Sequence, residues 1–146
     1  MEKEFFAKTK EETRDFGRKL ALELAPGTFL ALSGDLGAGK TALAQGILEG
    51  LGASGPYVSP TFVIMKEYAL PEPSPKGVKR VYHADAYRVE AKDFDTIGFA
   101  EWGSDPEGLV ILEWPERVSA LLPAERLTIT LLHEPDAGEG RHISIS

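Results

Sequence analysis

The chain has 146 residues and a mass of 15.9 kDa, a size typical of one domain that buries its hydrophobic core without disulfide or metal support. Its 16 basic and 23 acidic residues give a formal net charge of −7, which disfavours autonomous, nonspecific binding to the phosphate backbone of nucleic acids. With no cysteine, no signal-peptide layout and no apolar run of membrane-spanning length, the sequence excludes thiol catalysis and predicts a cytoplasmic protein that makes no membrane contact.

The first predicted elements are a helix, a strand and a second helix. A threonine and a glutamate with capping-box spacing open a helix over residues 10–24, and a Pro-Gly pair ends it. The short apolar run at 28–33 predicts a buried strand. Residues 40–51 follow as a helix with leucine and isoleucine at four-residue spacing. A glycine-rich turn joins this strand to this helix.

The glycine-rich turn matches the Walker A pattern of phosphate-binding loops, G-x-x-x-x-G-K-[ST], as Gly34-Asp35-Leu36-Gly37-Ala38-Gly39-Lys40-Thr41. Glycines let consecutive backbone N–H groups surround a β-phosphate, and the dipole of the following helix favours the same negative charge. Lys40 would contact the β- and γ-phosphates, and the Thr41 hydroxyl would bind Mg²⁺. The alternative is a glycine-rich turn that binds no ligand. The apolar strand before the turn and the helix after it favour the phosphate-binding loop over this alternative. The pattern therefore predicts a Mg²⁺–nucleotide site without giving the reaction.

Two acidic residues follow predicted strands and are candidates for the second acidic group of such a site. Asp85 ends the strand predicted over 78–85, and Glu113 directly follows the apolar strand 109–112, the layout of a Walker B motif. Ligands of α/β sheets bind at the C-terminal ends of the strands. Glu113 would hold the metal or polarise the attacking water, and Asp85 would order water or the outer shell of the metal. The alternative is that each acid has only a structural role and caps the start of a helix.

Four further residues lie close to these motifs in sequence. Thr61 follows a Ser-Pro pair where a GTPase-like switch threonine would sense the γ-phosphate, but the pattern taken alone favours an ordinary proline turn. Trp114 fits a packing role and a contact with nucleotide or partner equally. His83 is interpreted as a structural strand residue, because no second histidine lies at metal-ligand spacing. Arg88 is either an orienting group for Asp85, a phosphate contact or a solvated surface arginine.

The remaining elements complete an α/β pattern. Helices are predicted over residues 93–102 and 115–122, and strands over 61–70, 126–133 and 141–146. The alternation of strands and helices predicts one α/β domain over residues 1–146 with helices on both faces of the sheet. The chain has no asparagine, so the Asn-Lys-x-Asp motif that reads guanine cannot exist and ATP is the expected nucleotide.

Four motifs together resemble the TsaE family, the P-loop ATPases of bacterial tRNA threonylcarbamoyladenosine biosynthesis. They are the Walker loop, Ser59-Pro60-Thr61-Phe62, His83-Ala84-Asp85-Ala86-Tyr87-Arg88 and Leu112-Glu113-Trp114-Pro115-Glu116-Arg117. The resemblance implies a small P-loop NTPase domain with a mixed, mostly parallel sheet. It also implies association with the TsaD–TsaB heterodimer, in which TsaD transfers a threonylcarbamoyl group to the adenosine beside the anticodon. The ATPase would support repeated turnover of that complex, and tRNA is expected to be contacted only through it.

The resemblance also implies roles for individual residues. Glu113, Asp85 and Lys40 would be catalytic, and Thr41 and Glu113 would be the metal ligands. The residues expected to bind ATP are Asp35, Leu36, Gly37, Ala38, Gly39, Lys40, Thr41, Ala42, Thr61 and Trp114. Two positions depart from the family pattern: Ala42 stands where a second threonine is common, and Ala86 stands where the family has leucine.

Two other function classes remain open from the sequence. A small-molecule kinase would transfer phosphate to a metabolite, but no arginine-rich lid segment of the kind that closes over phosphates is visible. A non-hydrolysing, ATP-dependent binding module would bind Mg-ATP without turning it over. The intact pair of Thr41 and Glu113 favours hydrolysis over this last class.

Overall fold

The computed structural model describes residues 3–35, 37–57, 60, 64–96, 98–133, 138 and 140–146. The strands in these residues are β1 (Lys3–Ala7), β2 (Phe29–Ser33), β3 (Met65–Ala69), β4 (Arg80–Asp85), β5 (Gly108–Glu113), β6 (Leu127–His133) and β7 (Arg141–Ile145). The helices there are α1 (Lys10–Ala21), α2 (Lys40–Leu51), α3 (Ala91–Thr96), α4 (Phe99–Trp102) and the 3₁₀-helix η1 (Pro115–Leu121).

The strands form one sheet with the order β1-β7-β6-β2-β5-β4-β3. Parallel pairing joins β6 to β2, β2 to β5 and β5 to β4, whereas β1 with β7, β7 with β6 and β4 with β3 are antiparallel. Of the seven strands in the described residues, five therefore point the same way, and the mixed, mostly parallel sheet is confirmed. The C-terminal ends of β2, β5 and β4 consequently meet at one edge.

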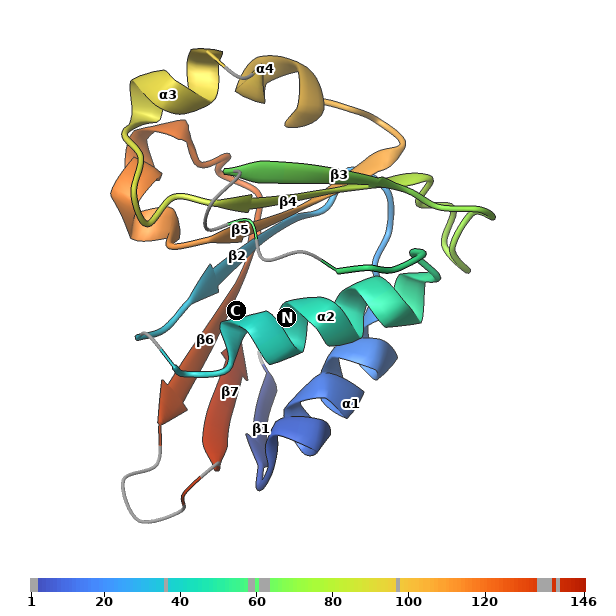
Figure 1. Ribbon diagram of the computed structural model, residues 1–146, viewed down its shortest axis with the longest axis vertical. Coiled ribbons are helices and arrows are strands. Elements are labelled where there is room, and N and C mark those ends of the chain that lie inside the picture. The colour runs from blue at the N-terminus through green and yellow to red at the C-terminus, as the bar shows by residue number, and fades with distance from the viewer. Residues whose placement is uncertain are drawn as a thin grey trace.

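Both faces of the sheet are covered, as the sequence predicts. Figure 1 shows α1 and α2 on one side of the sheet and α3 and α4 on the other. Side-chain alternation along the strands divides the core accordingly, because successive residues of a strand point to opposite faces. Leu30 and Leu32 of β2 pack in the core beside α1 and α2, and Phe29 packs in the second core with Phe94 of α3 and Trp102 of α4.

The boundaries of two predicted helices are wrong for backbone reasons. The helix predicted to reach residue 24 ends at Ala21, and the next amides donate to carbonyls three residues earlier, which tightens the turn ahead of Pro26. The helix predicted over 93–102 is two helices, and Gly98 between them has a φ of +86°, which no continuous helix accommodates.

Three smaller differences concern helix type and strand extent. The helix expected over 115–122 is the 3₁₀-helix η1, interrupted at Val118 with a φ of −131°. The strand expected from 61 begins at Met65, and residues 61–63 lie outside the described residues. The strand β1 is absent from the sequence prediction, and β2, β4, β5, β6 and β7 lie within two residues of their predicted ranges.

In the described part of the chain, no helix is long and apolar enough to cross a membrane.

Candidate functional site

The candidate site lies where β2, β4 and β5 end. β2 leads from Ser33 into the glycine-rich loop, and α2 begins at Lys40 directly after it. Asp85 at the end of β4 pairs in register with Glu113 at the end of β5. Topology therefore brings the loop and the two acids to the same sheet edge, where α/β proteins bind ligands.

These groups surround one cavity of about 400 Å³. Its lining consists of Lys10, Glu11, Arg14, Asp35, Gly37, Gly39, Lys40, Thr41, Ala42, Gln45, Asp85, Glu113 and Trp114. The structure thus brings together nine residues that the sequence predicts for the site. Ala38 is buried behind the loop, and Leu36 and Thr61 lie outside the described residues.

The loop backbone requires glycine at two positions for different reasons. Gly34 passes so close to β6 that a Cβ would lie 2.7 Å from the Leu131 carbonyl oxygen. Gly39 caps the N-terminus of α2 with a φ of +102°, a conformation that favours glycine. Among the described residues, no side chain caps this helix start and its first turn carries no acidic residue. The first-turn N–H groups of α2 therefore suit an anionic ligand.

Lys40 lies buried at the floor of the cavity. Its Nζ donates to the Gly34 carbonyl oxygen and, at 3.1 Å, to that of Asp35. The same nitrogen lies 3.9 Å from the centre of the Trp114 ring, in cation–π geometry. Burial lowers the pKa of Lys40, and the negative charges of Glu113, Glu116 and Asp85 oppose that shift. The ammonium group is thus held by carbonyl dipoles and an aromatic face inside an acidic cavity.

Trp114 adopts a backbone conformation that is unusual for a bulky residue. Its φ of +61° and ψ of +51° lie in the left-handed region, which costs free energy for a side chain of this size. Its ring lies 4.8 Å from that of Tyr87, centre to centre, and its amide donates to the Leu32 carbonyl oxygen at 3.3 Å. This backbone turn directs the indole over Lys40, so strain is concentrated where β5 meets the cavity.

Both acids are fixed by hydrogen bonds on one oxygen. Asp85 is 5% exposed, and its Oδ1 accepts from the Tyr87 amide at 2.8 Å. Glu113 is 4% exposed, and its Oε2 lies 2.7 Å from Nε2 of His83. The described residues contain no cluster of three or more His, Asp or Glu side chains that could hold a metal ion. One carboxylate, the Thr41 hydroxyl and ligand phosphate oxygens fit Mg²⁺, which rarely has an all-protein cage.

Arg141 of β7 is a site residue that the sequence analysis did not identify. Its guanidinium donates to the carbonyl oxygens of Ala38 at 3.0 Å and Gly37 at 2.9 Å. It also donates to Gly140 at 2.8 Å and Gly138 at 3.0 Å. Arg141 therefore joins the glycine-rich loop to the β6–β7 connection. No local pattern marks this arginine, because its loop partners lie more than 100 residues earlier.

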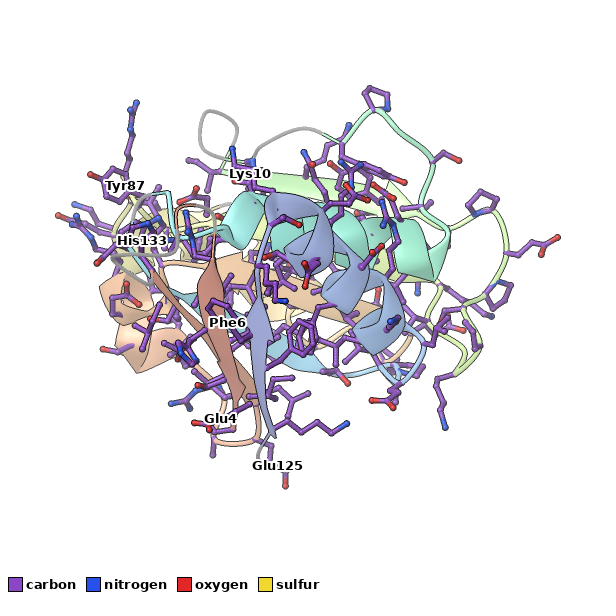
Figure 2. All side chains as sticks on the ribbon, turned by 90° about the horizontal axis from the view of Figure 1, so that it is seen from below. Glu4, Phe6, Lys10, Tyr87, Glu125 and His133 are labelled. Carbon is purple, nitrogen blue, oxygen red and sulfur yellow. The ribbon has the colours of Figure 1, made fainter. Side chains whose placement is uncertain are left out.

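The cavity wall opposite β5 comes from α1, which the sequence analysis also left unassigned. Lys10, Glu11 and Arg14 line it, and the Arg14 Nε donates to the Glu49 carboxylate of α2 at 2.6 Å. Figure 2 shows Lys10 on the same side of the molecule as Tyr87 and His133, away from Glu4 and Glu125. Arg88, considered beside Asp85, is exposed and does not line this cavity.

A family profile described as "Threonylcarbamoyl adenosine biosynthesis protein TsaE" matches residues 7–143. The chain belongs to the TsaE family. Two relatives described as "tRNA threonylcarbamoyladenosine biosynthesis protein TsaE" support this. The protein from Synechocystis is 41% identical over 81% of this chain and 73% of its own length. The protein from Bacillus subtilis is 40% identical over 86% of this chain and 75% of its own length.

The fold of a solved structure agrees with the TsaE assignment. The chain resembles the crystal structure of YdiB from Bacillus subtilis with a TM-score of 0.79 and 32% identity. The match covers 99% of this chain and 84% of that chain. The resemblance predicted from four motifs is therefore confirmed as TsaE membership. This membership connects the chain with the biosynthesis of tRNA threonylcarbamoyladenosine, for which the family and these relatives are named.

Proposed function

We propose that the chain is a Mg²⁺-dependent ATPase that supports tRNA threonylcarbamoyladenosine formation by acting on the TsaD–TsaB complex. One observation carries the proposal: the Walker loop, Lys40, Asp85 and Glu113 line a single cavity at the C-terminal edge of the sheet. A phosphate-binding loop and a strand-end acid in one cavity are the parts that P-loop hydrolysis needs.

Each side chain has a role that follows from its position. Lys40 exchanges its Gly34 and Asp35 carbonyl partners for β- and γ-phosphate oxygens, while α2 directs its first amides at the phosphates. Thr41 and Glu113 would hold a Mg²⁺ ion, which would supply positive charge to neutralise the phosphates. Asp85 would order a water molecule in the same cavity. The Trp114 indole keeps one side of Lys40 free of solvent.

The arrangement of arginines supports slow hydrolysis by the chain alone. Among the described residues, Arg14 is the arginine that lines the cavity, and its guanidinium is bound to Glu49. Arg141 is bound to loop carbonyls on the other side of the loop. Both guanidinium groups are thus engaged within the chain, and arginine fingers of P-loop enzymes can be supplied by a partner. We therefore expect the TsaD–TsaB heterodimer to stimulate turnover.

The conformational step is assigned to the segment before β3. Ile64 donates through its amide to the Pro60 carbonyl oxygen at 2.7 Å, and its own carbonyl accepts from the Asp85 amide at 2.9 Å. This segment is thus tied to the strand end that carries Asp85. Thr61 lies outside the described residues, and its sensing of the γ-phosphate stays a prediction. Ordering by ATP and release after hydrolysis would signal to the partner.

Charge and family membership support the proposed cellular setting. A net charge of −7 disfavours direct binding to the tRNA backbone, so tRNA is reached through TsaD–TsaB. A role in tRNA modification supports a location in the cytoplasm.

The test is ATP hydrolysis with and without purified TsaD–TsaB, combined with titration of Mg-ATP binding. Stimulation by the heterodimer is expected, with loss of binding in Lys40→Ala. Lys92→Ala removes a lysine side chain that is exposed and should behave as the wild type. Binding without hydrolysis in an active complex would contradict the proposal and favour a binding module. ATP consumption that requires an added metabolite, and not the heterodimer, would favour a kinase.

A further inference from the structure

His83 lies inside the wall of the candidate site although the sequence marks it only as a strand residue. It points to the same sheet face as Asp85, two positions later on β4, and lies beside Ile111 of β5. The side chains of His83 and Glu113 are 3% and 6% exposed. The 2.7 Å contact between His83 Nε2 and Glu113 Oε2 is therefore shielded from water on both sides.

The surroundings of the ring favour one tautomer. Nδ1 of His83 is buried and has no hydrogen-bond partner among the residues that the structure describes. A proton on Nδ1 would be an unpaired donor in a buried place, which is costly. A proton on Nε2 instead donates to the Glu113 carboxylate. A proton on Nε2 is therefore the placement that satisfies this arrangement.

The hydrogen bond affects how Glu113 can serve the cavity. With Oε2 occupied by His83, the carboxylate plane is fixed and Oε1 is the oxygen left for ligands in the cavity that Glu113 lines. Lys40 lines the same cavity, and its positive charge and the Glu113 carboxylate attract each other. Without His83, Glu113 is free to turn toward the Lys40 ammonium, which would withdraw both groups from phosphate and metal.

We propose that His83 is a positioning residue: its Nε2–H holds Glu113 away from Lys40, so that Lys40 stays free for phosphate and Glu113 Oε1 for the metal or water. The proposal rests on the proposed ATPase function, because it assigns a task to Glu113 in that reaction. Groups that orient a metal-binding side chain typically change affinity or activity by about 10–100-fold when removed.

Four variants and a control separate this role from packing. His83→Leu removes the donor, and His83→Gln retains an amide N–H that reaches the Glu113 carboxylate. Glu113→Gln and the double variant His83→Leu/Glu113→Gln complete a cycle. Val81→Ala is the matched control, since Val81 is fully buried on the same face of β4 and is not part of the cavity lining.

In partner-stimulated hydrolysis, we expect His83→Leu to lower kcat by about 10–100-fold, with His83→Gln close to the wild type. In the Glu113→Gln background, His83→Leu should change kcat no further, because the two residues act as one unit. Val81→Ala should lower thermal stability without lowering kcat. Independent, multiplying effects of His83→Leu and Glu113→Gln, or no rescue by glutamine, would overturn the proposal.

A second readout needs neither nucleotide nor partner. The chain has three histidines. In ¹⁵N spectra of the free protein, the ring signals of His83 are therefore assigned as those that are missing from the spectrum of His83→Leu. We expect a protonated Nε2 and an unprotonated Nδ1, with the Nε2–H shifted in Glu113→Gln. The opposite tautomer, or a ring insensitive to Glu113→Gln, would refute the positioning role even if hydrolysis is confirmed. Absent hydrolysis by the wild type together with the expected spectra would instead refute the proposed function.

Discussion

Strands β4 and β5 have charged groups at both ends, and the two ends differ in how those groups are paired. At the N-terminal end, the Arg80 guanidinium binds Asp105 through two bonds of 2.7 and 3.0 Å and reaches Glu107 at 3.1 Å. The Tyr82 hydroxyl donates to Asp105 at 2.6 Å. These hydrogen bonds strengthen one another by charge and by bidentate geometry. This end joins the loop before β5 to β4.

The C-terminal end has the opposite character. Lys40 is bound to carbonyl oxygens and an aromatic face, and the Trp114 backbone has a φ of +61°. In the part of the chain that the structure describes, one ring nitrogen of His83 has no partner. Such unsatisfied or strained groups are unfavourable for folding and persist where function requires them. The saturated N-terminal end holds the strands together, whereas the C-terminal end keeps charged groups for the proposed ligand.

The largest effect is expected from Glu113→Gln at the C-terminal end. Removing the charge that we propose to hold the metal ion or polarise water should lower partner-stimulated ATP hydrolysis by about 10²–10³-fold. Thermal stability should change little, because the amide still accepts a hydrogen bond from His83. Steady-state hydrolysis and thermal melts measure the two quantities. A large loss of thermal stability together with the loss of activity would show that the C-terminal end also stabilises the fold, which would contradict the difference between the two ends.

The next effect is expected from Arg141→Ala behind the loop. Loss of the donors to Gly37 and Ala38 removes the constraint on two loop peptides and should weaken Mg-ATP binding roughly tenfold, about 1.4 kcal/mol. Arg141→Lys retains the charge but not the fork of donors and should be intermediate. Isothermal titration measures both. Unchanged binding in Arg141→Ala would show that the loop keeps its shape without this arginine.

A stability effect without a functional effect is expected from Asp105→Ala. It leaves Arg80 and Tyr82 without their shared acceptor and should lower Tm by roughly 5–10 °C. Mg-ATP affinity at 25 °C should stay that of the wild type. Glu107→Gln is the control, because this side chain is 45% exposed and its loss should be nearly neutral. A change in nucleotide affinity in Asp105→Ala would show that the two ends of the strands are energetically coupled, which contradicts this prediction.

The smallest effect concerns pH. Hydrogen bonds from Arg80 above all, and from Tyr82, hold the pKa of Asp105 well below its ordinary value of 3.8. The unfolded chain then binds more protons, so this contribution is complete above about pH 4 and is lost as pH falls. Burial, and then the bond to Asp105, raises the pKa of Tyr82 to about 12 from 10.0. The folded form then retains more protons, so stability falls between pH 10 and 12.

Urea unfolding from pH 2.5 to 11 measures this profile, on the order of 1 kcal/mol for each limb. Asp105→Asn should flatten the acid limb and Tyr82→Phe the alkaline limb, each relative to the wild type. An acid limb that is unchanged in Asp105→Asn would assign it to other carboxylates.

The parts predicted from sequence are those that depend on neighbours in the chain. The Walker loop is local, α2 occupies its predicted residues, and Asp85 and Glu113 follow directly from strand ends. By contrast, β1 escaped prediction because four of its five residues are exposed and show no alternation. Its place is set by antiparallel pairing with β7 at the far end of the chain.

The contacts of His83 and Arg141 escaped prediction for the same physical reason. The first lies 30 residues from Glu113 and the second 103 residues from Ala38. Only the parallel register of β4 with β5 brings His83 next to Glu113, and only the sheet order brings β7 behind the loop. Local sequence patterns therefore predict the loop and the two acids of the site. Strand pairing determines which distant residues form hydrogen bonds with them.

The most direct test of the account counts tRNA modifications per TsaD–TsaB heterodimer in the presence of the wild-type chain or Glu113→Gln. Excess tRNA, threonylcarbamoyl-adenylate and Mg-ATP are supplied in both cases. Repeated rounds are expected with the wild type and arrest after the first round with Glu113→Gln, although Glu113→Gln still binds Mg-ATP. Equal numbers of rounds with both proteins would contradict an ATP-hydrolysing site at the C-terminal ends of β4 and β5.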